Sequence, residues 1–244
     1  MSTIISGKNP VIEALEAGLT INKIYLAAGP KHSVDNKIIL LARQQGIPIR
    51  EVDRKKLVEL AGHENTQGVI AVLIPMAYCA IEDIFTRARE KNESALIAIL
   101  DEIQDPHNLG AIIRSAEAFG FHGVIIPKDR SVGLTDTVAK TSAGAVSHIP
   151  VVRVNNIART LDDLKKDGLW IAGADQESVT PFYQADLNRA LGVVVGNEGK
   201  GLRRLVKEKC DFLIRIPMVG RISSLNASVA AALIFCEARK QRFS

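Results

Sequence analysis

Three segments of the sequence carry polar residues suited to chemistry, and each follows a run of apolar residues typical of a strand. The first contains Asn108 and Arg114, the second is the glycine-rich run 196–202, and the third is Ser-Ser-Leu-Asn at 223–226. Parallel α/β sheets bind ligands at the carboxyl ends of their strands, where such segments would meet. The three segments therefore predict one site.

Each segment taken singly also has a simpler structural explanation. Arg114 lies away from the apolar stripe of the helix predicted at 108–119, as solvated arginines commonly do. Asn108 can cap that helix, and Ser-Ser-Leu-Asn before an alanine-rich run is equally typical of a helix N-cap. The glycines of the run 196–202 also suit a tight turn from strand to helix. At this level both explanations stay open.

The glycine-rich run 196–202 fits neither of the common phosphate-binding motifs. A Walker loop needs Ser or Thr after its Gly-Lys pair, but Gly201 follows Lys200 here. A dinucleotide fingerprint needs G-x-G-x-x-G after the first strand of its domain, whereas this run reads G-x-x-G-x-G late in the chain. The run therefore favours a ligand with few phosphates or none.

Bulk composition restricts the class of partner. The formal net charge is +4 and the pI is about 9.0, which permits a polyanion partner. Cys79, Cys210, Cys236 and the five histidines lack the spacing of metal ligands, so no metal site is expected. The first residues lack the apolar core of a signal peptide, and no apolar run approaches the ~20 residues that span a bilayer. We expect a cytoplasmic protein that does not enter a membrane.

The elements that must position these residues alternate between helix and strand. Aromatic residues are only 5% of the chain against 47% hydrophobic residues, so the core must be aliphatic, as in many α/β proteins. Residues 1–75 are expected to form a small α/β domain with helices at 6–17, 36–45 and 53–60 and strands at 21–26, 47–52 and 69–74. Asp53 is expected to cap the third of these helices.

Residues 76–93 change character and are interpreted as a linker or connecting helix. Residues 94–244 then alternate strongly enough to predict a second domain with a parallel, doubly wound sheet. The small residues at 141–145 could line a pocket or let elements pack closely. The strands are expected at 95–100, 123–126, 149–154, 169–172, 191–195 and 212–216, before a final helix at 225–239.

Three longer stretches that include these segments resemble the SpoU (TrmH-type) branch of the SPOUT RNA methyltransferases. They read D-P-H-N-L-G-A-I-I-R-S-A-E-A-F-G at 105–120, V-V-V-G-N-E-G-K-G-L at 193–202, and I-R-I-P-M through S-S-L-N-A-S-V-A-A-A at 214–232. This resemblance covers residues 94–244. The N-terminal part, with S-G-K-N-P-V-I-E-A-L and N-T-Q-G-V-I-A-V, resembles the RNA substrate-binding domain of bacterial ribosomal RNA guanosine 2′-O-methyltransferases.

The resemblance implies a fold and an activity. It implies a C-terminal parallel-sheet SPOUT domain tied into a deep trefoil knot, and a homodimer with its active site at the subunit interface. It also implies S-adenosyl-L-methionine as cofactor, no metal, and methylation of a ribose 2′-hydroxyl, with a guanosine of 23S ribosomal RNA as the expected target.

Residue roles follow from the resemblance position by position. Arg114 is the family's candidate for activating the hydroxyl, but a guanidinium stays protonated and is a poor base. We therefore expect Arg114 to grip the adjacent phosphate and activate the hydroxyl electrostatically, with Glu198 fixing Arg114 or a neighbouring polar group. The implied catalytic residues are Asn108, Arg114, Glu198, Ser224 and Asn226. The implied cofactor-binding residues are Gly196, Ile216 and Leu225, with Thr141, Ser142, Gly144, Asn197 and Met218 nearby.

Three other functions remain to be weighed. The same chemistry could act on a transfer RNA ribose or on an adenosine of ribosomal RNA. A non-catalytic RNA-binding protein of the same fold would not need so complete a polar set around an apolar pocket. A nucleotide-dependent α/β enzyme is disfavoured because both phosphate-binding motifs fail.

Overall fold

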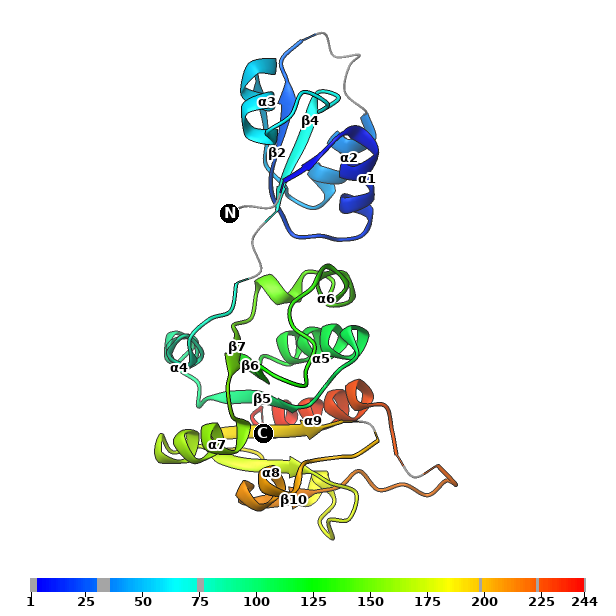
Figure 1. The fold of residues 1–244 in the computed structure, drawn as a ribbon. Helices are drawn as coiled ribbons and strands as arrows, with labels where there is room; N and C mark the ends of the chain where they lie inside the picture. Colours follow the sequence, from blue (N-terminus) through cyan, green and yellow to red (C-terminus); the bar gives the residue numbers. More distant parts are fainter. Residues whose placement is uncertain (1–3, 30–35, 74–76, 198, 223, 244) are drawn as a thin grey trace. The chain divides into compact units, whose positions relative to one another are not determined.

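The computed structural model describes residues 4–29, 36–73, 77–197, 199–222 and 224–243. Its internal contacts divide the chain into two compact units, Met1–Met76 and Ala77–Ser244 (Figure 1). Each unit contains one sheet and its own apolar core. No helix in these described ranges is long and apolar enough to cross a membrane.

The first unit is a small α/β domain with a four-stranded sheet in the order β1-β4-β2-β3. Its elements are β1 (Ile4–Ser6), α1 (Lys8–Glu16), β2 (Ile21–Ala27), α2 (Asn36–Gln44), β3 (Ile49–Val52), α3 (Arg54–Ala61) and β4 (Val69–Leu73). β4 runs antiparallel to β1 and β2, and β3 is parallel to β2. Apolar residues of α1 and α2, such as Leu15 and Ile38, cover β2 and β4.

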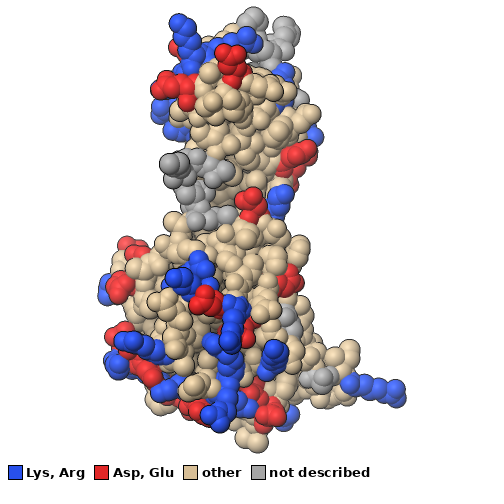
Figure 2. All heavy atoms as spheres, in the orientation of Figure 1, with Lys and Arg blue, Asp and Glu red and all other residues tan. Residues whose placement is uncertain are grey.

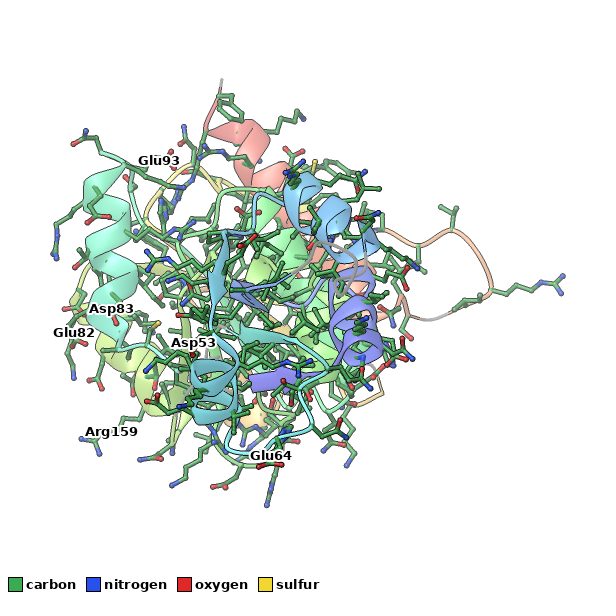
Figure 3. The ribbon with its side chains drawn as sticks, turned by 90° about the horizontal axis from the view of Figure 1, so that it is seen from above. Asp53, Glu64, Glu82, Asp83, Glu93 and Arg159 are labelled. Carbon is green, nitrogen blue, oxygen red and sulfur yellow. The ribbon has the colours of Figure 1, made fainter. Side chains whose placement is uncertain are left out.

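The start of the first unit differs from the prediction. A helix was expected from residue 6, but Ile4–Ser6 forms an edge strand on β4 and the helix begins at Lys8. Gly7 makes the corner with a φ of 101°, a conformation that favours glycine. The partner strand lies more than 60 residues away, so local periodicity could not reveal the pairing. The predicted Asp53 cap of α3 is confirmed, because its carboxylate accepts from the Lys56 amide at 2.7 Å (Figure 3).

The second unit contains a six-stranded sheet in the order β10-β8-β9-β5-β6-β7, and every neighbouring pair is parallel. The strands are β5 (Leu96–Asp101), β6 (Gly123–Pro127), β7 (Val151–Val154), β8 (Trp170–Ala174), β9 (Leu191–Gly196) and β10 (Phe212–Ile214). The helices are α4 (Ile81–Glu90), α5 (Pro106–Ala118), α6 (Asp136–Thr141), α7 (Ile157–Lys166), α8 (Arg204–Lys209) and α9 (Ala227–Gln241). Short 3-10 turns lie at Ala145–Ser147 and Phe182–Gln184. The predicted class, a small α/β domain followed by a parallel-sheet domain, is confirmed.

Helices cover both faces of the second sheet. On one face, Ile84 of α4, Leu161 of α7 and Val206 of α8 share a core with Ile97 and Ile99 of β5. α5 and α9 pack together on the other face (Figure 1). The chain leaves the sheet after β7, returns at β8, and then inserts β9 between β8 and β5. This insertion brings the ends of β8, β9 and β5 together.

α4 falls in the segment interpreted as a linker or connecting helix, and its inner face is part of the second core. Ile84 and Ala88 are buried there. A Cβ atom at Gly123, the first residue of β6, would lie 2.4 Å from Ile84 carbons, so the bare glycine allows α4 to approach the sheet. Residues 81–90 are therefore packed on the second unit.

Candidate functional site

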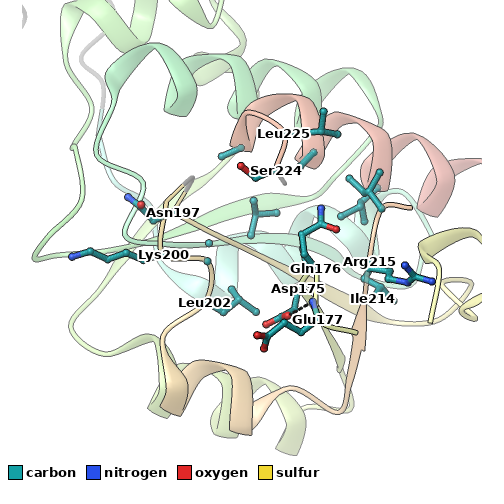
Figure 4. A pocket seen from close by; sticks show the side chains of 18 of the residues that line it. Asp175, Gln176, Glu177, Asn197, Lys200, Leu202, Ile214, Arg215, Ser224 and Leu225 are labelled. Carbon is teal, nitrogen blue, oxygen red and sulfur yellow. Dashed lines mark hydrogen bonds between the residues drawn. The ribbon is translucent and has the colours of Figure 1, made fainter. Parts of the chain in front are cut away.

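A cavity of about 430 Å³ opens at the carboxyl ends of β8, β9 and β10, beside the start of α9 (Figure 4). This is the edge of the sheet at which the sequence predicts a ligand. Its wall comes from the ends of three strands and from α9: Ala174, Asp175, Gln176, Glu177, Val195, Gly196, Asn197, Gly199, Lys200, Gly201, Leu202, Lys207, Ile214, Arg215, Ile216, Ser224, Leu225, Ala227, Ala230 and Ile234.

The glycine-rich run forms a tight turn at the mouth of this cavity. The Gly201 amide donates to the Asn197 carbonyl at 2.9 Å, and the Asn197 amide donates to the Gly201 carbonyl at 3.2 Å. A Cβ atom at Gly196 would lie 2.4 Å from the Gly201 carbonyl, so no side chain fits there. Gly201 has a φ of 64°. The turn explanation and the ligand explanation are therefore compatible, because the closed turn is itself part of the cavity wall.

The last residue of β5, Asp101, and the residue after it, Glu102, hold the ends of this turn. The Asn197 side chain donates to the Glu102 carbonyl at 3.1 Å. The fully buried Asp101 carboxylate accepts from the Arg203 amide at 2.9 Å and from its Nε at 2.8 Å. Hydrogen bonding to Asp101 raises the pKa of the Arg203 guanidinium. Sequence reasoning missed this pair, because 102 residues separate its members and neither stands in a motif.

The floor of the cavity carries a compensated charge cluster that the sequence also did not predict. Lys207 Nζ lies 2.7 Å from Asp175 and 2.9 Å from Glu177 (Figure 4). Hydrogen bonds to Asp175 and then Glu177 raise the pKa of Lys207. Lys207 therefore reduces the negative charge of the cavity wall.

The opposite wall is apolar and offers main-chain groups. Ile216 is 8% exposed, and its amide forms no hydrogen bond with any described residue; the same holds for the Leu225 amide. The Nε atom of Arg215 is also buried without a partner among the described residues. Flat apolar walls with free main-chain donors suit an adenine ring, and the predicted residues Gly196, Ile216 and Leu225 all line this cavity. The residues present therefore fit an adenosyl cofactor.

Asn226 connects α9 to α5. Its Oδ1 caps α9 by accepting from the Ser228 amide at 2.9 Å, as the sequence predicts for a helix start. Its Nδ2 donates to Asn108 Oδ1 at 2.9 Å, so two predicted catalytic side chains are in direct contact. Ser224 lies two residues before Asn226, on the cavity wall.

The expected capping role of Asn108 is wrong. α5 begins earlier, at Pro106, and Asp105 caps it by accepting from the His107 amide at 2.9 Å. Proline suits the first turn because it has no amide hydrogen to satisfy, which moves the cap back to Asp105. Asn108 is consequently inside the helix, 7% exposed, with its side chain directed at Asn226.

Arg114 lies on the same helix and is exposed to solvent. Within the described part of the chain, its guanidinium forms no hydrogen bond or ion pair. Glu198, the expected partner of Arg114, lies outside the described residues. In the same described part, no group of three or more side chains could hold a metal ion.

Asn197 also lines the cavity, but the other predicted cofactor residues, Thr141, Ser142, Gly144 and Met218, do not. Ser142 is fully buried and donates to the Ala139 carbonyl at 2.9 Å. A Cβ atom at Gly110 would lie 2.6 Å from the Thr141 Cβ, so small residues here let α6 pack closely on α5. Gly144 follows in the next turn with a φ of 83°, and Met218 lies beyond β10.

Two family models match the chain. One describes the SpoU rRNA Methylase family and matches residues 95–236. The other describes RNA 2′-O ribose methyltransferase substrate binding and matches residues 4–79. These ranges correspond closely to the two sheets.

Curated relatives and solved structures agree with the family models. YacO of Bacillus subtilis (strain 168), named as a TrmH family tRNA/rRNA methyltransferase, is 48% identical over 98% of this chain and 95% of its own length. The SpoU methyltransferase AviRb of Streptomyces viridochromogenes, in complex with AdoMet, is 26% identical with a TM-score of 0.68, covering 99% of this chain and 91% of that one. The AdoMet-bound rRNA methyltransferase of Sinorhizobium meliloti is 25% identical with a TM-score of 0.66, covering 100% and 88%.

The sequence resemblance is thus confirmed across both units. The two family models match the same two regions that the resemblance covers. The cavity, with its glycine turn, apolar wall and free main-chain donors, lies in the second of these regions. The chain belongs to the SpoU (TrmH) family of tRNA and rRNA methyltransferases.

Proposed function

We propose that this protein transfers the methyl group of S-adenosylmethionine to a ribose 2′-hydroxyl, and that the target is a guanosine of 23S ribosomal RNA. S-adenosylmethionine is the methyl donor, and when bound it supplies an electrophilic methyl carbon on a sulfonium. The match of residues 4–79 to an RNA 2′-O ribose substrate-binding model supports ribose as the acceptor. A cytoplasmic location is part of the proposal.

The contact between Asn108 and Asn226 is the observation that carries the proposal. It joins two residues that are 118 positions apart, and it lies immediately beyond Ser224 and Leu225 of the cavity wall. A helix cap needs only the Oδ1 of Asn226. The Nδ2 bond to a buried Asn108 instead fixes polar side chains at the cavity mouth, where an acceptor ribose must approach the methyl group.

Each residue then has a defined task. Gly196, Ile216 and Leu225 hold the adenosyl moiety through main chain and apolar surface. Ser224 and Asn226 orient the ribose, which aligns its hydroxyl oxygen for in-line displacement. The exposed Arg114 grips the phosphate next to the target ribose and favours the developing negative charge on the hydroxyl oxygen.

The site is completed by a second copy of the chain in this proposal. Val229 and Leu233 project from α9 at 48% and 41% exposure, one helical turn apart. Such a stripe suits burial against an equivalent helix in a homodimer. Glu198 fixes Arg114 in the assembled site. Asn197 supports the cofactor at the cavity wall, and Thr141, Ser142, Gly144 and Met218 support it through the packing of the surrounding elements. The deep trefoil knot in the C-terminal unit stays a prediction.

A transfer RNA ribose is the second candidate, because relatives such as YacO are named as tRNA/rRNA methyltransferases. The experiment uses S-adenosylmethionine with a labelled methyl group and total RNA from cells that lack the protein. The label should appear in 23S ribosomal RNA as 2′-O-methylguanosine after nucleoside digestion. Label in transfer RNA, or in 2′-O-methyladenosine, would identify a different target nucleotide. Label on a base, or none, would contradict ribose methylation.

A further inference from the structure

Three cationic side chains meet at the ends of β6 and β7, on the same edge of the sheet as the cofactor cavity. Lys128 follows β6 directly, and its amide donates to the Val154 carbonyl at the end of β7 at 2.7 Å. Arg153 of β7 donates through Nη2 to the Lys128 carbonyl at 2.9 Å. Arg130 follows two residues later. Lys128, Arg130 and Arg153 are all exposed, and we name them the β6–β7 cationic surface.

This surface is held in place by the surrounding chain. The loop that carries Lys128 and Arg130 is tied to the Ile103 carbonyl by the Val132 amide at 3.0 Å and the Ser131 hydroxyl at 2.8 Å. The Tyr78 hydroxyl accepts from the Leu134 amide at 3.0 Å. The ring of the same tyrosine lies under the Arg153 guanidinium, 5.2 Å from its centroid. The loop backbone and the Arg153 guanidinium are thus held before any ligand arrives, which lowers the entropic cost of binding.

Local carboxylates leave most of this positive charge unpaired. The described carboxylates next to it are Asp129, which is exposed, and Glu102. Arg130 is 73% exposed, and its contact with Glu102 is long, at 3.5 Å. Glu102 makes an equally long contact with Arg203, so its charge is shared between the two arginines. Figure 2 shows that Lys and Arg mix with Asp and Glu over the visible face of the second unit. Charge density alone therefore does not single out a surface; the tied loop and the oriented Arg153 guanidinium do.

The surface is continuous with the cavity through Glu102. The carboxylate of Glu102 contacts Arg130, and its carbonyl accepts from the Asn197 side chain at the cavity mouth, at 3.1 Å. A polyanion bound along the three cations would therefore extend toward the turn that lines the cofactor cavity. The spacing of exposed guanidinium and ammonium groups suits a chain of phosphates.

We propose that the β6–β7 cationic surface binds the sugar–phosphate backbone of the substrate RNA beside the target ribose, separately from the N-terminal unit. This inference rests on the proposed function for the identity of the polyanion. Arg153 contacts a phosphate from its held position, Lys128 contacts another from the end of β6, and Arg130 exchanges its long contact with Glu102 for a phosphate. The surface supplies affinity and positioning without reading sequence.

The test removes the three charges together in the full-length protein: Lys128→Gln, Arg130→Gln and Arg153→Gln. The matched control removes three cations from the opposite edge of the sheet: Arg89→Gln, Lys91→Gln and Lys166→Gln. Arg89 lies in the last turn of α4, Lys91 directly follows that helix, and Lys166 is the last residue of α7. Affinity for a labelled single-stranded RNA of mixed sequence is measured over a series of salt concentrations. Cofactor affinity and thermal unfolding are measured on the same preparations.

Affinity for RNA falls as salt rises, and each phosphate contact to a single strand contributes roughly 0.7 to the steepness of the plot of log affinity against log salt. Loss of three contacts should therefore make this plot less steep by about 2. The control should keep the wild-type slope, and all proteins should bind S-adenosylmethionine equally. A wild-type slope in the triple variant, or an equal fall in the control, would overturn the inference. If Arg153→Gln lowers thermal stability, the Lys128→Gln, Arg130→Gln double variant decides, with an expected fall of about 1.4.

The RNA-binding measurement does not depend on methyl transfer, so the two proposals can fail separately. An unchanged slope with normal ribose methylation rejects only this surface. A reduced slope with label on a base rejects only the ribose assignment.

Discussion

The two edges of the C-terminal sheet use the same residue types for different purposes. At the amino edge, Arg239 binds Glu93 through two hydrogen bonds of 2.8 and 3.3 Å, and Arg242 donates to the Ser94 and Ala95 carbonyls. Figure 3 shows Glu93 close to the end of α9. At the carboxyl edge, Lys128 and Arg153 are exposed and form no ion pair with the described residues. Arg114, on α5, is likewise exposed and forms no bond with the described residues.

This difference separates stability from binding. The arginines at the amino edge hold the end of α9 against the sheet, because their guanidinium groups form hydrogen bonds within the protein. Cations at the carboxyl edge keep hydrogen-bonding capacity that a phosphate can use. Substitutions at the amino edge should therefore change the free energy of unfolding, whereas those at the carboxyl edge should change binding and catalysis.

The largest effect is expected from separating the two hydrogen-bonding roles of Asn226. A serine caps a helix about as well as asparagine, but it cannot donate to Asn108. Asn226→Ser should lower the methyl-transfer rate on the order of 10²-fold while thermal unfolding changes little. Asn156→Ser, the same change at the N-cap of α7, is the matched control and should leave the rate unaltered. Equal rates for both variants would restore the explanation of Asn226 as a cap only.

The amino edge should lose stability in mild acid because of His122. This side chain is fully buried, and its Nδ1 accepts from the Leu96 amide at 3.0 Å. Burial lowers the pKa of His122 to about 4, although Glu93 opposes this. In the unfolded chain this imidazole is protonated as pH falls below about 6.5, whereas in the folded chain it stays neutral down to about pH 4. The contribution of His122 to stability is therefore complete above pH 6.5 and is lost as pH falls from 6.5 to 4.

The expected loss across that window is roughly 2–3 kcal/mol of unfolding free energy. Denaturant unfolding at several pH values would measure it. His122→Asn keeps an acceptor for the Leu96 amide and removes the titration, so its stability should depend less on pH between 6.5 and 4. Parallel pH dependence in the two proteins would exclude His122 as the cause.

Asp101 tests whether the glycine turn must be held from the sheet. Asp101→Asn keeps an acceptor for the Arg203 amide but loses the charge that binds its guanidinium. Cofactor affinity should fall about tenfold, which corresponds to about 1.4 kcal/mol. Titration calorimetry with S-adenosylmethionine would measure it, and Lys207→Gln would report on the cavity floor for comparison. Unchanged affinity in Asp101→Asn would show that the turn holds its own shape.

The smallest effect is expected from the exposed part of the amino edge. Glu93→Gln should weaken the bond to Arg239 and lower stability by about 1 kcal/mol, because both side chains are partly solvated. Glu93 has a lowered pKa, chiefly from its hydrogen bond to Arg239, so this contribution is lost as pH falls through that pKa. The rate of methyl transfer should not change at neutral pH, and a matching fall in rate would break the separation of the two edges.

Local patterns predicted what depends on nearby residues. Apolar runs identified the six strands of the second sheet, and capping chemistry identified Asp53 and Asn226. Contacts between distant residues were beyond such patterns: the position of β9 between β8 and β5, the edge strand Ile4–Ser6, and the Asp101–Arg203 pair.

The β6–β7 cationic surface shows the same limit. Its members come from two strands' ends, and no run of basic residues marks them in the sequence. Asn108 shows the reverse: its residue type was singled out correctly, but its assigned capping role was wrong because Pro106 moved the helix start. The resemblance identified the motifs, whereas the structure supplied the contacts between them.

Arg114→Ala is the most direct test of the account. Single-turnover methyl transfer to RNA and the dissociation constant for S-adenosylmethionine would be measured on wild type and variant. Because Arg114 is exposed and makes no bond to the described residues, stability and cofactor affinity should be unchanged while transfer falls by at least about 10²-fold. Methyl transfer at the wild-type rate would contradict a catalytic role for Arg114.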